Sequence, residues 1–282
     1  MAKFILSAFA DEASADFTAQ LEALKTHGIP LIEIRGVDGK NILDLTDEEL
    51  AVVKEKLTAY GIGVSAIGSP IGKVDVNGDL AAHFERFKRC VEIAKTLGAD
   101  RIRIFSFFMP KDEDPEPYFE TVVTQLKAMV AYAEENGVHC CHENEKGIYG
   151  DILPRVQKIH EAVPGLRLVF DPANYIQCKD RPIENFRVLG KQIDYMHIKD
   201  SFLADGAVVP AGEGDGNIPE ILSALNECEN TYILTLEPHL AVFNGLQNLQ
   251  YEELTRKYTY ESNEAAFASA VNALKAILSA IA

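Results

Sequence analysis

The feature that most constrains the fold of this chain is a regular alternation between short apolar runs and longer amphipathic stretches. Eight runs have the length and composition of buried strands, at residues 4–9, 31–35, 63–69, 101–107, 138–143, 166–171, 193–200 and 232–237. Stretches that predict helices lie between and after them, at residues 14–27, 46–60, 80–97, 118–136, 152–163, 182–191, 218–228 and 263–281. Strands that alternate with helices in this way predict parallel β/α units.

The number of these units favours a closed barrel, because eight β/α units in about 250 residues are typical of that architecture. We therefore predict an α/β fold in which residues 1–282 form a single (β/α)8 TIM barrel domain with a C-terminal closing helix at 263–281. An open doubly wound sheet is the alternative. That fold often carries a phosphate-binding glycine fingerprint after its first strand, where this chain has FADEAS without glycine.

Polar side chains end four consecutive predicted strands: Glu143, Asp171, His197 and Glu237. The catalytic groups of such barrels lie at the C-terminal strand ends, so we expect these four to converge. Three converging buried carboxylates must be neutralised by protons, bases or a metal ion. Three carboxylates and one imidazole suit a divalent metal, with Mn²⁺ favoured and Mg²⁺, Co²⁺, Zn²⁺ or Fe²⁺ possible. The alternative is that each acid pairs separately with a lysine or arginine.

Composition limits the possible partners and the compartment. The chain has 27 Lys and Arg against 43 Asp and Glu, a formal net charge of −16, which argues against nucleic acid as a partner. No apolar stretch approaches the roughly 20 residues that span a bilayer, so we expect no membrane partner. The 5 cysteines form no CxxC pair, and we interpret them as reduced thiols of a cytoplasmic protein.

Eight short motifs carry a family resemblance that covers nearly the whole chain: FADE (9–12), IEIRG (32–36), GSPIGK (68–73), HENEKGIYGD (142–151), FDPANY (170–175), HIKD (197–200), PAGEGDG (210–216) and LEPH (236–239). Together they resemble the xylose isomerase-like TIM barrel superfamily. That superfamily includes sugar phosphate isomerases and epimerases, ketose 3-epimerases, inosose dehydratases and AP endonuclease family 2. The resemblance places the family's metal ligands at the same four strand-end residues.

The resemblance also implies a chemistry: isomerase or epimerase activity in carbohydrate metabolism. A divalent metal would polarise a ketose carbonyl and its neighbouring hydroxyl and stabilise an enediolate. Glu143 and Glu237 would act as the acid/base pair as well as ligands, one on each side of the sugar.

Further residues are candidates for substrate binding, each with an ion pair or ordinary packing as the alternative: Glu33, Arg35, Lys73, Lys146, Tyr149, Asn174, Lys199 and His239. No arginine-rich phosphate clamp is visible, which favours a substrate without phosphate. A homo-oligomer is possible, and the aromatic-rich residues 240–262 would cover either the site or an interface.

Two positions depart from the family pattern and leave other functions open. Asn174 stands where the endonucleases and ketose epimerases usually have histidine, and Leu203 stands where the epimerases have arginine. An amide cannot shuttle a proton near neutral pH. A lyase or dehydratase acting on a keto-inositol or 3-keto-glycoside is therefore an alternative, followed by a sugar-binding barrel without catalysis. The scarcity of histidine at the other strand ends argues against a DNA-repair enzyme.

Overall fold

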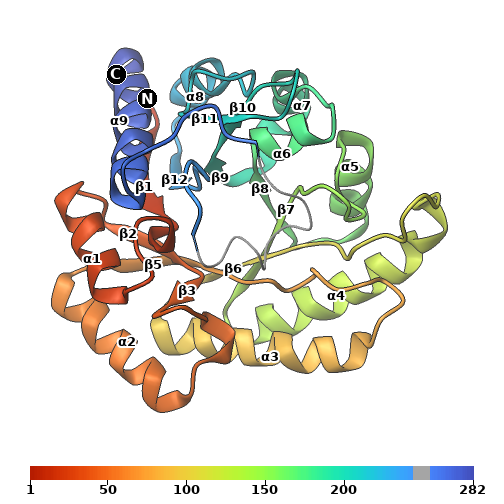
Figure 1. The fold of residues 1–282 in the computed structure, drawn as a ribbon. Helices are drawn as coiled ribbons and strands as arrows, with labels where there is room; N and C mark the ends of the chain where they lie inside the picture. Colours follow the sequence, from red (N-terminus) through yellow and green to blue (C-terminus); the bar gives the residue numbers. More distant parts are fainter. Residues whose placement is uncertain (244–254) are drawn as a thin grey trace.

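The structure is a computed structural model that describes residues 1–243 and 255–282, and it confirms the predicted barrel (Figure 1). Eight parallel strands close in the order β1-β12-β9-β8-β7-β6-β5-β2. Their bounds are β1 Lys3–Ala8, β2 Leu31–Ile34, β5 Gly63–Gly68, β6 Arg101–Ile104, β7 His139–Glu143, β8 Arg167–Phe170, β9 Ile193–Ile198 and β12 Thr231–Leu236. Because β1 pairs in parallel with both β2 and β12, the sheet has no free edge among these strands.

The predicted helices surround the barrel, as Figure 1 shows. They are α1 Phe17–Thr26, α2 Asp47–Tyr60, α3 Leu80–Leu97, α4 Phe119–Glu135, α5 Leu153–Ala162, α7 Pro182–Leu189, α8 Ile218–Asn226 and α9 Asn263–Ile281. Local sequence explains their ends: Thr46 and Glu49 form a capping box at the start of α2. Gly61 ends the same helix with a φ of 67°, a left-handed conformation that glycine adopts without strain.

Several short elements were not predicted, and most of them follow the C-terminal ends of barrel strands. They include the hairpin β3 Gly36–Val37 with β4 Lys40–Asn41, the helix α6 Pro172–Gln177, the pair β10 Asp200–Ser201 with β11 Val208–Val209, and the 3-10 turns η1 Ala10–Glu12, η2 Ile42–Asp44, η3 Glu116–Tyr118 and η4 Gly190–Gln192. The hairpin follows β2, α6 follows β8 and β10 follows β9. These elements therefore build the side of the barrel where the predicted site lies.

The barrel interior is layered along the strands. Cys141, Val169 and Tyr195 are buried together in an inner apolar cluster. Side chains two residues apart on a strand face the same side. The next inward positions towards the C-terminal ends are therefore Glu143, Asp171 and His197.

Helix α9 corrects one sequence prediction. By length and composition it is apolar enough to cross a membrane, although we predicted that no stretch approaches this length. One such helix is weak evidence, and α9 is amphipathic here. Its residues Phe267, Val271 and Leu274 are buried, whereas Asn272 and Lys275 are exposed.

A buried carboxylate organises the loop between β11 and α8. The side chain of Asp200 accepts hydrogen bonds from the backbone N–H groups of Gly212, Gly214 and Gly216 at 2.8, 3.1 and 2.9 Å. A Cβ atom at Gly214 would lie 2.3 Å from Asp200 Oδ1, so the loop approaches too closely for a larger residue. Asp200 therefore holds this loop against the barrel.

Replacing Asp200 with Asn should destabilise the protein, because an amide nitrogen would face backbone donors that now share a carboxylate. We expect the free energy of unfolding to fall by about 2–4 kcal/mol in urea titrations. Asp205→Asn is the matched control, since Asp205 is exposed and accepts a hydrogen bond from the backbone N–H of Ala207 at 2.9 Å. An equal loss of stability in both variants would contradict this role.

Acid should destabilise the fold partly through His83, which is buried on α3. Its Nε2 accepts the Gly72 N–H at 2.9 Å, and burial, with a contribution from Arg86, lowers its pKa from 6.5 to about 4. Below pH 6.5 the unfolded chain takes up a proton that the folded protein excludes until about pH 4. The contribution of neutral His83 to the free energy of unfolding is therefore fully present above pH 6.5. It is lost as the pH falls towards 4, by up to about 3 kcal/mol.

The measurement is urea unfolding across that pH range for the native protein and His83→Gln. Glutamine offers an acceptor to Gly72 but does not titrate, so the acid-side slope should decrease by one proton. An unchanged slope would show that His83 does not contribute.

Candidate active site

The four predicted strand-end residues converge at the C-terminal end of the barrel. Glu143 ends β7, Asp171 follows β8, His197 lies on β9 and Glu237 follows β12, and these strands are consecutive neighbours. One potential ligand atom from each residue lies within 4.8 Å of the others. All four residues are between 0 and 3% exposed, so they form a buried group, which we call the strand-end cluster.

His197 lies at the centre of the strand-end cluster. Its Nδ1 is 3.1 Å from both Glu143 Oε1 and Glu237 Oε2, and its Nε2 is 3.1 Å from Glu33 Oε2. The hydroxyl of Tyr195 donates to Glu33 Oε1 at 3.0 Å and so fixes that carboxylate. Burial alone would lower the pKa of His197, but the surrounding carboxylates raise it well above 6.5.

Each carboxylate of the strand-end cluster meets a buried cation. Glu143 Oε2 is 2.7 Å from Arg103 Nη1, and Glu237 Oε1 is 2.9 Å from Arg35 Nη1. Lys199 Nζ is 2.9 Å from an oxygen of Asp171 and 3.6 Å from one of Glu237. The pairing with lysine and arginine that we considered as an alternative is therefore present, in addition to the convergence.

The electrostatics keep two glutamates ionised. Burial raises the pKa of both Glu143 and Glu237, but nearby cations outweigh it: His197 and Arg103 lower the pKa of Glu143, and Lys199 and His197 lower that of Glu237. Burial dominates at Asp171, whose pKa rises to about 7 despite Lys199.

The donors of the strand-end cluster fit a divalent ion. Asp171 Oδ2 and Glu237 Oε2 are buried and accept no hydrogen bond of regular geometry from the described residues, although Lys199 is near both. Carboxylate oxygens with one imidazole suit hard or borderline divalent ions. Glu143, Asp171, His197 and Glu237 could therefore hold such an ion.

Asn174 belongs to this site through hydrogen bonds rather than as a proton carrier. Its side-chain Nδ2 donates to Glu143 Oε1 and to Asn144 O, both at 2.9 Å. Its backbone N–H donates to Asp171 Oδ1 at 2.9 Å, because Asp171 is the N-cap of α6. Asn174 thus orients two potential ligands at once.

A second group of acids and histidine adjoins the strand-end cluster. Glu12, Glu237 and His239 place potential ligand atoms within 4.8 Å of one another, and all three are buried. His239 has a φ of 51°, an uncommon value outside glycine, and its N–H donates to Glu12 Oε2 at 2.7 Å. Burial, chiefly, raises the pKa of Glu12 to about 8, so this acid is largely protonated at neutral pH.

The remaining predicted contact residues divide into two kinds. Lys73 is half-buried near the site, with Nζ 2.9 Å from Glu145 Oε2 and 4.4 Å from the ring centroid of Phe105. Lys146 is exposed on the loop after β7. The ring of Tyr149 packs on that of Phe119, with centroids 5.8 Å apart, towards the helix layer. Tyr149 therefore contacts Phe119 and Glu116 in the described residues, on the side of the helix layer.

The sequence analysis missed Arg103, Asp11 and Glu12. Arg103 was passed over because it lies in the middle of the predicted strand 101–107. The RIRI alternation was a usable signal, since two arginines on one face of a buried strand point into a barrel. Asp11 and Glu12 stand in the quoted FADE motif, directly after the first strand.

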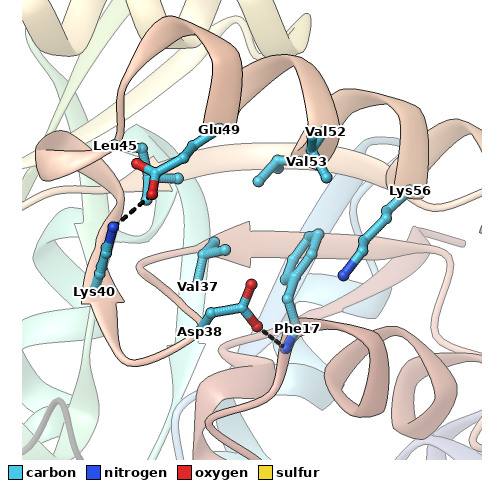
Figure 2. Close-up of a pocket in the computed structure, with 9 residues that line it drawn as sticks. All are labelled: Phe17, Val37, Asp38, Lys40, Leu45, Glu49, Val52, Val53 and Lys56. Atoms are coloured by element: carbon cyan, nitrogen blue, oxygen red, sulfur yellow. Dashed lines mark hydrogen bonds and ion pairs between the residues drawn. The ribbon is translucent and has the colours of Figure 1, made fainter.

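A surface cavity lies elsewhere, between α1, α2 and the β3–β4 hairpin (Figure 2). Lys40 and Glu49 form an ion pair at its rim. The cavity shares no residue with the strand-end cluster. Its lining residues are Phe17, Val37, Asp38, Lys40, Leu45, Glu49, Val52, Val53 and Lys56.

Fold and site together define a (β/α)8 barrel protein with a buried carboxylate–imidazole cluster at the C-terminal strand ends. The sequence model of the xylose isomerase-like TIM barrel matches residues 21–258. The chain belongs to this family, as the motifs predicted. No curated protein sequence matches it.

Solved structures with the same fold are numerous but distant in sequence. An IOLI protein with a bound zinc atom has a TM-score of 0.76 and 22% identity, over 99% of each chain. A 3-keto-D-glucoside 4-epimerase from E. coli has a TM-score of 0.67 and 14% identity, over 99% of this chain and 100% of that one. A probable 3-DHS dehydratase from Bacillus anthracis has a TM-score of 0.71 and 16% identity, over 98% and 99%.

One similar structure is much longer. A xylose isomerase-like TIM barrel/4-hydroxyphenylpyruvate dioxygenase fusion protein has a TM-score of 0.75 and 16% identity. This chain covers only 43% of it, while 99% of this chain is matched. At these identities the likeness shows the fold alone.

Proposed function

We propose that this protein is a metal-dependent isomerase or epimerase of a sugar or sugar derivative. The observation that carries the proposal is the pair of ionised carboxylates, Glu143 and Glu237, at equal distances of 3.1 Å from His197 Nδ1. When bound, a divalent ion would supply Lewis-acid polarisation of a carbonyl and its neighbouring hydroxyl. We propose Mn²⁺ as the ion; the similar structure that contains zinc supports a divalent ion in this fold.

The two glutamates are suited to moving a proton next to a carbonyl. Their carboxylates are ionised, so each can accept a proton. Arg103 fixes Glu143 and Arg35 fixes Glu237, and the strands that carry the two glutamates, β7 and β12, are separated by β8 and β9 in the barrel. One glutamate can take a proton from one face of a sugar carbon, and the other, once it has taken up a proton from solvent or from a substrate hydroxyl, can return that proton to the second face.

A lyase or dehydratase is the second candidate, because Glu12 supplies a group that it needs. Expulsion of a β-hydroxyl or β-glycosidic oxygen requires a proton donor. Glu12, whose pKa is about 8, lies beside Glu237 and could protonate such a leaving group. The likeness to a probable dehydratase supports this candidate at the level of the fold.

Proton exchange with solvent tests both candidates. The protein reconstituted with Mn²⁺ would be incubated in D₂O with ketoses, keto-inositols and 3-keto-glycosides, and the products analysed by mass spectrometry. Deuterium at one carbon next to the carbonyl supports the isomerase or epimerase, and an unsaturated product supports the lyase. Tight sugar binding without deuterium incorporation at any metal would instead indicate a binding protein.

We also propose a cytoplasmic location, which the 5 free cysteines Cys90, Cys140, Cys141, Cys178 and Cys228 support. Fractionation of the native host, followed by detection of the protein, tests it.

A further inference from the structure

Arg103 is a buried cation, and the part of the chain that the structure describes uses only some of its hydrogen-bond donors. The residue is 1% exposed, and its Nη1 donates to Glu143 Oε2 at 2.7 Å. Its Nε and Nη2 have no hydrogen-bond partner among residues 1–243 and 255–282. The guanidinium carbon lies 4.5 Å from the ring centroid of Phe105 and 5.4 Å from that of Phe9, so aromatic rings flank the group.

The two unused donors belong to the same edge of the guanidinium group. Nε–H and one N–H of Nη2 point in parallel, and this edge matches the two oxygens of a carboxylate. Buried charged donors without an acceptor are costly, so a partner is expected when this edge is desolvated.

Arg35 shows how this protein fills the corresponding edge. Its Nη1 donates to Glu237 Oε1 at 2.9 Å, as Arg103 Nη1 donates to Glu143. Its Nε and Nη2 donate to the two oxygens of Asp11, both at 2.9 Å. The two arginines therefore contact the two proposed catalytic glutamates in the same way, but among residues 1–243 and 255–282 only Arg35 has a carboxylate on its second edge.

We propose that the substrate carries a carboxylate, which binds side-on to Nε and Nη2 of Arg103. This inference rests on the proposed function only in placing the substrate at the strand-end cluster. The ligand class is a sugar acid or a related hydroxy- or keto-acid. Such a carboxylate would accept hydrogen bonds from both Nε and Nη2. Because Nη1 stays hydrogen-bonded to Glu143, the bound acid would lie next to a proposed catalytic carboxylate.

Two other acceptors could satisfy the same edge. Two neighbouring sugar hydroxyls present oxygens at a similar spacing, and a phosphate presents the same pair of anionic oxygens. A planar carboxylate fits best between flanking aromatic rings, because it can lie in the plane of the guanidinium group. It is also the group that Asp11 presents to Arg35.

The test compares ligands that differ only in this group. D-glucose, D-glucuronate and D-glucose 6-phosphate form one set, and matched sets of ketoses, their keto-acids and their phosphates form others. Binding is measured by calorimetry on the metal-loaded native protein, on Arg103→Lys and on Arg103→Gln. We expect an acid to bind more tightly than its neutral and phosphorylated partners, and to lose about 10- to 100-fold in affinity in both variants.

Arg103→Lys tests whether acid binding needs the paired N–H donors or only a positive charge, because lysine keeps a cation beside Glu143 without the paired donors. Arg101→Lys is the matched control. Arg101 lies on the same strand but pairs with Asp194 and Asp100, so ligand preference should not change. Metal content and circular dichroism of each variant show whether the site and fold persist.

Each outcome decides the proposal. Tighter binding of a neutral or phosphorylated sugar, no selective binding of any acid, or an acid preference that Arg103→Lys retains would overturn it. Solvent deuterium exchange on neutral sugars without acid preference would leave the proposed function standing and remove this inference. Acid binding that depends on Arg103, without deuterium exchange on any substrate, would support this inference and remove the proposed function.

Discussion

Replacing His197 with alanine should remove the divalent ion, from about one ion per chain in the native protein to nearly none. His197 is the only nitrogen donor of the strand-end cluster and lies 3.1 Å from two of its carboxylates. Without the imidazole, three carboxylates remain beside Lys199, which competes for their oxygens. Metal content by mass spectrometry, after reconstitution with Mn²⁺ and desalting, measures the effect.

His142→Ala is the matched control for this experiment. His142 is also a fully buried histidine and lies on β7, directly before Glu143. Its ring lies near that of His160, and its Nε2 is 3.0 Å from Ser106 Oγ. It should keep the ion. If His197→Ala binds Mn²⁺ as well as the native protein, the strand-end acids are not a metal site, and they would serve as hydrogen-bond partners of a bound sugar.

Glu237→Gln should abolish proton exchange while the fold persists. Glutamine has the same shape, and its Oε1 can still accept the hydrogen bond that Arg35 donates to Glu237 at 2.9 Å. It cannot accept a proton from carbon, so the rate of solvent deuterium incorporation should fall by about 10²- to 10⁴-fold. The rate is compared at saturating metal, with the bound metal quantified in the same sample.

Glu145→Gln provides the comparison, since Glu145 is buried near the site but pairs with Lys73 rather than with the cluster. It should retain most of the exchange rate. Full turnover by Glu237→Gln with the metal bound would exclude Glu237 as the acid/base group. A loss of rate that parallels a loss of metal would assign Glu237 to ligation alone.

Much of the fold followed from local patterns. Strand and helix periodicity predicted all eight barrel strands, because a buried parallel strand and an amphipathic helix each leave a regular signal. Helix α6 was missed because it is only 6 residues long and starts at Pro172, directly after Asp171, the last residue of a predicted strand. We predicted that no apolar stretch is long enough to span a membrane, but α9 meets that criterion by length and composition.

The convergence of Glu143, Asp171, His197 and Glu237 was predictable for a general reason. In a closed parallel barrel the C-terminal strand ends meet at one end, so polar residues at consecutive ends must lie close together. This argument needs neither rotamers nor loop conformations. It fails for Tyr149, because the loop turns at Gly147, with a φ of 82°, and carries that ring towards α4.

The sequence by itself determined the barrel, the family and the four residues of the strand-end cluster, since all three follow from periodicity and from the ends of strands. Only the tertiary structure decided which cation meets which carboxylate. Arg35 forms hydrogen bonds with Asp11, which is 24 residues away in the sequence, and with Glu237, which is 202 residues away. No local sequence pattern encodes such contacts. That one edge of Arg103 has no acceptor among the described residues is likewise visible only in the tertiary structure, because it depends on which side chains the closed barrel brings within hydrogen-bonding distance.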